Sequence, residues 1–264
     1  EIVFDGMSAV GIKPHRTVEM GIARTFQNIR LFGNMTALET VLTGMHCRTG
    51  SGFLSSFLKT KRQRIEEERC RGIAYEFLKL VGLEEDAEEV ATSLPYGKQR
   101  RLEIARALAT HPQLILLDEP AAGMNDSETE VLRQLIGKIR DLGITVVVID
   151  HDLHAVLPYA NRMALMVDGE VVCDSDVATT LGYMYDHDIY VDALPSVFTT
   201  YMELEKAGYH SDAPWLSIES AIEGLHQIEM AKAIERSRYD EPNHTIADGE
   251  SITQDTNNVG ESTG

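Results

Sequence analysis

Two acidic residues, Asp118 and Glu119, come directly after the apolar run of residues 114–117. A continuous apolar run is typical of a strand in a parallel sheet that is buried on both faces. Ligands of open parallel sheets bind at the carboxyl ends of the strands. At that edge, Asp118 is placed to hold a magnesium ion, and Glu119 is placed to orient or deprotonate a water that attacks a phosphate.

Two more polar residues follow predicted strands. His151 comes after the buried strand predicted over residues 144–150, where its ring could hydrogen-bond a terminal phosphate. Gln27 follows an earlier predicted strand that starts after Gly21, and it is placed to reach the metal or the water. Each of these residues is common at a strand end when taken alone. Their order and spacing along the chain carry more information than any one of them.

The stretch "LPYGKQRRLEIARALA" places Gly97 just before an amphipathic helix, where free N–H groups and the helix dipole favour a phosphate. Lys98 adds positive charge there. The sequence has no GxxxxGK[ST] loop, because Gly97-Lys98 and Gly137-Lys138 are followed by Gln and Ile. Such a loop supplies most of the binding of the β and γ phosphates. We therefore expect the chain alone to bind ATP very weakly.

The elements that must position these residues alternate between strands and helices. This order predicts a parallel sheet with helices on its faces. A helical region is predicted over about residues 34–90, and Thr36 with Glu39 forms a predicted capping box near its start. The other predicted elements are helices over residues 127–143 and 153–162, and a hairpin over 163–172 that turns at Asp168 and Gly169.

The formal net charge of −18 lies mostly in the last third of the chain, where residues 174–264 hold 18 acidic and 4 basic side chains. This balance argues against a nucleic-acid partner, because phosphate binding requires Lys and Arg. Helices are predicted over residues 197–208 and 211–238, and the second has an apolar stripe. The residues of this stripe are Ile218, Ile222, Leu225 and Ile228. From about residue 240 few large apolar residues remain, so we predict disorder.

In this order the segments resemble the ATP-binding cassette of ABC transporters over about residues 1–173. Gln27 matches the Gln loop, and the matching motifs are "LPYGKQRR" (signature), "LILLDEP" (Walker B), "AAGMN" (D-loop) and "IDHD" (His switch). "GIARTFQNIRLFGNMTALETVL" and "YGKQRRLEIARAL" are similar to the ATP-binding subunits of branched-chain amino acid importers. The resemblance implies an α/β fold, a P-loop NTPase-like cassette core with a parallel sheet and a helical subdomain.

The resemblance also implies an ATPase that couples ATP hydrolysis to amino acid import, with ATP and Mg²⁺ as cofactors. In such proteins two cassettes pair head to tail, and each ATP lies between the phosphate loop of one and the signature of the other. The residues implied to face the partner's nucleotide are Tyr96, Gly97, Lys98 and Gln99. The implied catalytic residues are Glu119, His151 and Gln27, and the implied metal ligands are Asp118 and Gln27.

The partners implied by the resemblance are a second cassette, transmembrane permease subunits and, indirectly, a periplasmic binding protein, but no nucleic acid. The subunit would lie peripherally on the cytoplasmic face of the inner membrane. Its helical segment 34–90 would receive the cytoplasmic helices of the permease subunits.

The missing Walker A loop is the main departure from the family pattern. Because the family's cassette extends further upstream, we expect the printed sequence to be truncated, without the first strands, and the chain alone to be inactive. The parts expected are a partial nucleotide-binding domain over residues 1–173 (helical subdomain about 34–97), a helical appendage of unknown role over 174–239, and a disordered acidic tail over 240–264.

Two alternatives stay open. One is a non-catalytic interaction subunit that lends its signature motif to a partner cassette with a phosphate loop. The other is an ABC ATPase that acts outside transport, although no second cassette, coiled coil or basic surface is visible in the sequence.

Overall fold

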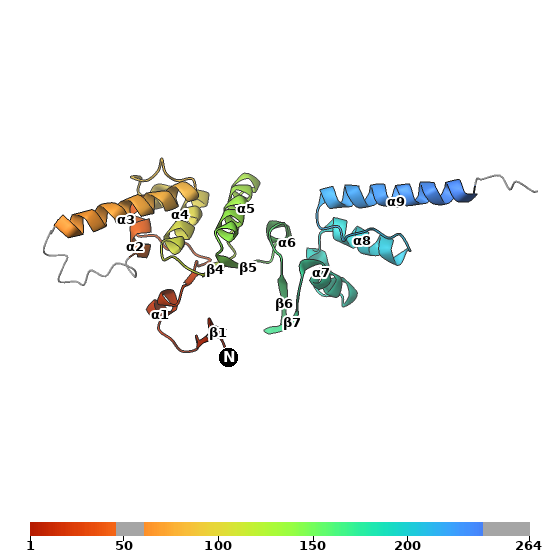
Figure 1. Cartoon of the computed structure of the whole chain (residues 1–264), viewed down its shortest axis with the longest axis horizontal. Coiled ribbons are helices and arrows are strands. Elements are labelled where there is room, and N and C mark those ends of the chain that lie inside the picture. Colours follow the sequence, from red (N-terminus) through yellow and green to blue (C-terminus); the bar gives the residue numbers. More distant parts are fainter. Residues whose placement is uncertain (46–60, 240–264) are drawn as a thin grey trace, which may run out of the picture.

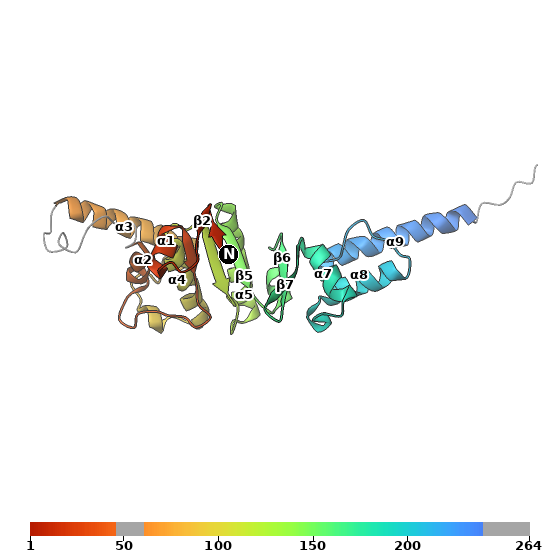
Figure 2. The same ribbon diagram turned by 90° about the horizontal axis from the view of Figure 1, so that it is seen from below.

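The computed structural model describes residues 1–45 and 61–239, so the predicted disordered tail 240–264 lies outside the described residues. The molecule is elongated, with the helix of residues 61–80 at one end, the sheet near the middle and the helices of residues 177–239 at the other end (Figure 1). Figure 2 shows the same arrangement after a quarter turn. No helix among the described residues is long and apolar enough to cross a membrane.

The central sheet is parallel, as predicted. Its strands β3 (Ile22–Arg24), β4 (Leu114–Asp118) and β5 (Thr145–Ile149) are ordered β3-β4-β5. Leu117 is fully buried, and Val148 packs against the same core as α5 (Asp126–Asp141). Because the three strands are parallel, all of them end at one edge, next to the predicted site residues.

The prediction that both faces of these strands are buried is wrong for β5. Its alternate residues Thr145, Val147 and Ile149 are exposed, Val147 by 41% and Ile149 by 58%. The helices α4 (Tyr96–Leu108) and α5 contribute to the core on one side of the sheet. Among residues 1–45 and 61–239 nothing buries these β5 side chains on the other side, so β5 alternates in exposure.

A helical layer formed by α2 (Ala37–Met45), α3 (Lys61–Leu80) and α4 flanks the sheet. The predicted capping box is present, since Thr36 N–H donates to Glu39 Oε2 (2.9 Å) and Glu39 N–H to Thr36 Oγ1 (3.2 Å). The 3₁₀ turn Ala91–Ser93 leads into α4. The short elements near the N-terminus are β1 (Val3–Phe4), β2 (Met7–Ser8) and α1 (Pro14–Glu19).

The next part of the chain contains the predicted hairpin. Strands β6 (Met163–Val167) and β7 (Glu170–Ser175) are antiparallel, and Asp168 and Gly169 both have positive φ (50° and 85°), as a tight two-residue turn requires. Helix α6 (Leu153–Val156) is shorter than predicted and ends before Pro158, as expected of a residue that cannot continue a helix.

Three helices complete the described chain: α7 (Val177–Asp186), α8 (Ser196–Lys206) and α9 (Ile218–Tyr239), with a 3₁₀ turn at Val191–Ala193. The sequence analysis did not predict α7, although Asp176 caps its start by accepting from Thr179 N–H. Strand β7 crosses residue 173, and the domain boundary placed there stays a prediction.

The stripe predicted on α9 is buried only in part. Ile228 is 7% exposed, whereas Ile218, Ile222 and Leu225 are 67%, 51% and 45% exposed. The packing face is set by Trp215, which lies so close to Gly224 that a Cβ there would be 1.9 Å from its indole Nε1. The side of α9 that carries Ala221, Gly224 and Ile228 therefore packs against Trp215. The other three apolar residues of the stripe face solvent.

Candidate functional site

Three of the predicted residues meet at the carboxyl edge of the sheet. Gln27 Nε2 donates to Glu119 Oε2 at 2.6 Å, and His151 Nδ1 lies 3.4 Å from Glu119 Oε1. The Glu119 side chain is 28% exposed and His151 is 79% exposed. The residues follow β3, β4 and β5 respectively, so the parallel register of the strands brings them together.

Asp118 has a partner that the sequence analysis missed. Arg24 Nη2 lies 2.9 Å from Asp118 Oδ2 in an ion pair, and Arg24 pairs with Leu116 in the register of β3 and β4. The signal was available, because Arg24 ends a predicted strand beside the one that Asp118 ends. The Asp118 carboxylate is 25% exposed at the sheet edge.

The residues at this edge fit a magnesium ion only in part. No group of three His, Cys, Asp or Glu residues that could hold a metal exists in the described part of the chain. Mg²⁺ is usually held by one or two carboxylates together with substrate phosphates, so a set made of Asp118 and the amide oxygen of Gln27 is compatible with it.

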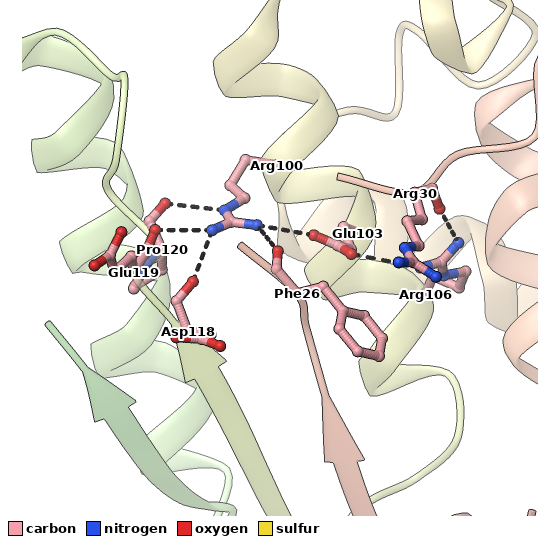
Figure 3. A network of polar contacts seen from close by, with 8 residues as sticks. All are labelled: Phe26, Arg30, Arg100, Glu103, Arg106, Asp118, Glu119 and Pro120. Carbon is pink, nitrogen blue, oxygen red and sulfur yellow. Dashed lines mark hydrogen bonds and ion pairs between the residues drawn. The ribbon is translucent and has the colours of Figure 1, made fainter. Parts of the chain in front are cut away.

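Arg100 is the central residue that sequence reasoning missed. Its side chain is fully buried in α4 and uses all five N–H donors (Figure 3). The acceptors are Asp118 O (2.9 Å), Glu119 O (2.8 Å), Pro120 O (3.2 Å), Phe26 O and Glu103 Oε2 (3.1 Å). The helical spacing of Arg100, Ile104 and Ala107 places this arginine on the apolar face of α4, which was the available signal.

Glu103 balances the buried charge of Arg100. It is 1% exposed, and its Oε1 lies 3.6 Å from Arg106 Nη2. Burial raises the pKa of Glu103, whereas the charges of Arg100 and Arg106 lower it. Arg106 Nη1 also donates to Arg30 O at 2.6 Å. Side chains of α4 thus hold main-chain carbonyls on both sides of Gln27, at Phe26 and Arg30.

The four predicted signature residues occupy the first turn of α4. Tyr96 is 44% exposed and lies beside Gly123. A Cβ at Gly97 would be 2.5 Å from Glu128 Oε1, so the Glu128 side chain at the start of α5 would have to shift to admit a larger residue. Lys98 Nζ donates to both carboxylate oxygens of Asp86 (2.8 and 2.7 Å).

The amide of Gln99 is also directed into its own chain, because its Nε2 donates to Leu94 O at 2.7 Å. Among the three side chains of the signature residues, that of Tyr96 is therefore the most exposed, while Lys98 and Gln99 form contacts within the chain. None of these contacts tests the roles predicted for these residues.

A cavity of about 540 Å³ lies on the side of α4 that faces α1, α2 and β3. Its lining includes the apolar residues Val18, Ala23, Phe32 and Ala107, together with the charged residues Glu103 and Arg106. Phe32 is 54% exposed, so an apolar ring is open to solvent at this cavity.

Asp150 is a buried carboxylate next to His151. Its side chain is 5% exposed, its Oδ1 accepts from Asp152 N–H at 3.0 Å, and its Oδ2 has no hydrogen-bond partner among the described residues. Burial raises the pKa of Asp150, and the hydrogen bond from the Asp152 amide lowers it less. The ionised form is thus disfavoured in the native state.

The raised pKa of Asp150 predicts a pH-dependent effect on stability. The native state binds this proton more tightly than the unfolded state, so the contribution of Asp150 to the free energy of unfolding falls as pH rises through that window. Asp150→Asn keeps the Oδ1 acceptor and removes the charge. We expect it to raise Tm at pH 7 and to change Tm little at pH 4, measured by thermal denaturation. Asp141→Asn, at a side chain 71% exposed, is the control, and equal effects of Asp150→Asn at both pH values would contradict the assignment.

Comparison with known proteins gives one consistent family. A family model described as ABC transporter matches residues 1–122. The chain is 40% identical over 174 residues to the high-affinity branched-chain amino acid transport ATP-binding protein BraF of Pseudomonas aeruginosa, covering 66% of this chain and 68% of BraF. It is 39% identical over 160 residues to LivG of Escherichia coli, of the same description, covering 60% of this chain and 63% of LivG. The chain thus spans about two thirds of the length of these relatives.

Solved structures agree with this. A nucleotide-free ATP-binding cassette from an ABC transporter superposes with a TM-score of 0.59 at 26% identity, covering 73% of this chain and 76% of that one. The ADP conformation of an ATP-binding cassette gives 0.58 at 29% identity, covering 71% and 75%. A bacterial ABC transporter cassette solved as a dimer gives 0.54 at 28%, covering 66% and 72%. The fold is therefore the predicted ABC cassette fold of the P-loop NTPase type, and the chain belongs to the ATP-binding proteins of ABC transporters.

Proposed function

We propose that the chain is the ATP-binding subunit of an importer for branched-chain or related amino acids, in which ATP hydrolysis drives transport. The observation that carries this proposal is the meeting of Gln27, Glu119 and His151 at the carboxyl edge of the sheet. The names of BraF and LivG support the substrate class.

In the proposed mechanism Glu119 accepts a proton from the attacking water. The amide of Gln27, which donates to Glu119 Oε2, fixes the carboxylate and leaves its own oxygen to face the metal or the water. His151, mostly exposed beside Glu119, is free to donate to an oxygen of the terminal phosphate. A magnesium ion held by Asp118 and Gln27 would neutralise phosphate charge. Arg24 would have to leave Asp118 when that ion binds.

The contacts to the β and γ phosphates are the part that this sequence lacks. Because the printed sequence has no GxxxxGK[ST] loop, we expect these residues alone to bind Mg-ATP weakly, and hydrolysis at Glu119 requires that such phosphate contacts be supplied. The chain's first turn of α4 instead faces a nucleotide held by the phosphate loop of a second cassette. Tyr96 is the side chain of this turn that is most open to that partner.

The cavity lined by Phe32 is the surface that we assign to the permease subunits. It lies between the helical layer and β3, close to the segment 26–30 that α4 holds by its arginines. A helix of a permease subunit bound there would shift the segment 26–30 and therefore the position of Gln27. The subunit would then lie at the cytoplasmic face of the inner membrane, with the periplasmic binding protein as an indirect partner.

A charge at the exposed signature position tests the pairing of cassettes. We expect the chain to associate with a cassette that carries a phosphate loop in the presence of Mg-ATP, and we expect Tyr96→Glu to weaken this by at least about tenfold, because a carboxylate would face phosphates. Analytical ultracentrifugation measures the association. Tyr75→Glu is a matched control, since Tyr75 is 43% exposed on α3. Equal association by both variants would count against the assigned role of the signature turn.

A polar residue at the cavity tests the permease contact. Phe32→Ser removes an exposed apolar ring from the cavity, so we expect loss of co-purification with detergent-solubilised permease subunits and no change in Tm. Leu142→Ser, at a residue 62% exposed beyond the end of α5, should co-purify normally. Retention by Phe32→Ser would place the permease contact elsewhere, and absence of any permease from the wild-type sample would favour an ABC ATPase outside transport.

The alternative of a non-catalytic interaction subunit is favoured by the missing phosphate loop. It gives Glu119 no role in hydrolysis. The substitution Glu119→Gln in the gene therefore distinguishes the importer ATPase from the non-catalytic subunit, because the amide cannot take a proton from water. We expect uptake of labelled leucine by the cells to fall at least about a hundredfold. Glu130→Gln, at a side chain 50% exposed on α5, is the control, and normal uptake with Glu119→Gln would support the non-catalytic role.

A further inference from the structure

The backbone of Glu119 has a conformation that its sequence does not favour. Its φ is +41°, in the left-handed region where most L residues are strained. Four of the other described non-glycine residues with positive φ are of the types that tolerate this region: Asp5, His111, Asp168 and Asp188. Glu119 is not of these types, and it precedes Pro120, which drives the residue before it towards extended backbone. The local turn contributes one hydrogen bond, from Ala122 N–H to Glu119 O at 3.2 Å, and further contacts come from outside the local sequence.

Arg100 provides such contacts from α4. It donates to the carbonyls of three consecutive residues, Asp118, Glu119 and Pro120, at 2.9, 2.8 and 3.2 Å. Its side chain is fully buried, so these bonds are shielded from water and are correspondingly strong. On the other side, Glu119 N–H donates to Ile149 O at 2.8 Å. The peptide groups on both sides of Glu119 are therefore fixed.

The turn determines where the carboxylate points. In the left-handed conformation Glu119 reaches Gln27 and His151, which follow the strands on either side of β4. An extended backbone at this position would send the side chain elsewhere.

We propose that Arg100 is a positioning residue that holds Glu119 in its left-handed conformation and thereby directs its carboxylate toward Gln27 and His151. The proposal rests on the proposed function only for the catalytic use of Glu119. Lysine cannot replace Arg100 in this role, because an ammonium group lacks the planar fork that reaches several carbonyls at once.

A double-mutant cycle on the full chain, without nucleotide, tests this. Glycine adopts positive φ at no steric cost, so Glu119→Gly removes the strain that Arg100 opposes. Arg100→Gln should lower Tm by roughly 5–10 °C in the wild-type background. The loss should be larger by at least roughly 2 °C in the Glu119→Gly background, because removing the arginine there no longer releases backbone strain. Glu119→Ala is the matched control, since it removes the carboxylate but keeps a Cβ, and there the loss should match that of the wild-type background.

Amide hydrogen exchange supplies a readout that general destabilisation would not reproduce. Arg100→Gln should speed exchange at the Glu119 amide far more than at the Ile104 amide in the middle of α4. Glu119→Gly combined with Arg100→Gln should restore slow exchange at position 119. Uniformly faster exchange, or equal Tm losses in the Glu119→Gly and Glu119→Ala backgrounds, would show that Arg100 only packs α4 and would overturn the proposal.

Folding failures are informative as well. If Arg100→Gln folds only when combined with Glu119→Gly, the proposal is supported; if it folds in no background, Arg100 is needed for the core as a whole and the proposal is wrong. These outcomes are independent of ATP. A positive cycle in a chain that never pairs with a cassette would keep the positioning role and reject the proposed function.

Discussion

The buried guanidinium of Arg100 is the interaction on which the site depends. A charge in the interior is stable only when it is paired and hydrogen-bonded, and losing one partner of such a pair costs about 3–5 kcal/mol. Here Glu103 supplies the opposite charge and four main-chain carbonyls accept the remaining bonds. These carbonyls belong to the segments that carry Gln27 and Glu119, so one side chain of α4 ties the signature helix to both.

Through these contacts α4 links three parts of the cassette. The helix begins with the residues proposed to face a partner cassette, and one turn later it holds the ends of β3 and β4. Two turns later Arg106 holds Arg30 and lines the cavity assigned to the permease. A displacement of α4 on pairing would therefore be transmitted to the water-activating residue and to the membrane contact by the same rigid element.

The sequence predicted the core of the site because parallel strands end at one edge. Gln27, Glu119 and His151 each follow a strand, and the family motifs set their order. The strand end at Arg24 and the apolar helical face at Arg100 were visible in the sequence, but their long-range partners, 18 to 94 residues away in the chain, depend on packing that the sequence does not show. The exposed side of β5 was missed for a similar reason. An apolar run shows that Val147 prefers burial, but it does not show which element would cover it.

Lys98 illustrates the limit of motif reading. Its place in the signature suggested a positive charge available to a phosphate. In the structure Lys98 forms an ion pair with Asp86, and no motif in the sequence indicates this pairing. Gly97, which is implied to face a nucleotide, also lies against the Glu128 side chain, which would have to shift to admit a Cβ. A substitution at Gly97 would therefore disturb the contact with α5 as well as any nucleotide contact.

Trp215 gives the C-terminal helices an optical property of their own. It is the single tryptophan of the chain, it is 2% exposed, and its indole N–H donates to Ser211 Oγ at 3.1 Å while its ring packs on Gly224 of α9. The tryptophan emission therefore reports on the packing between α8 and α9, which lie far along the chain from the sheet. Emission and far-ultraviolet dichroism, followed on one sample, separate the melting of these helices from that of the cassette without any added label.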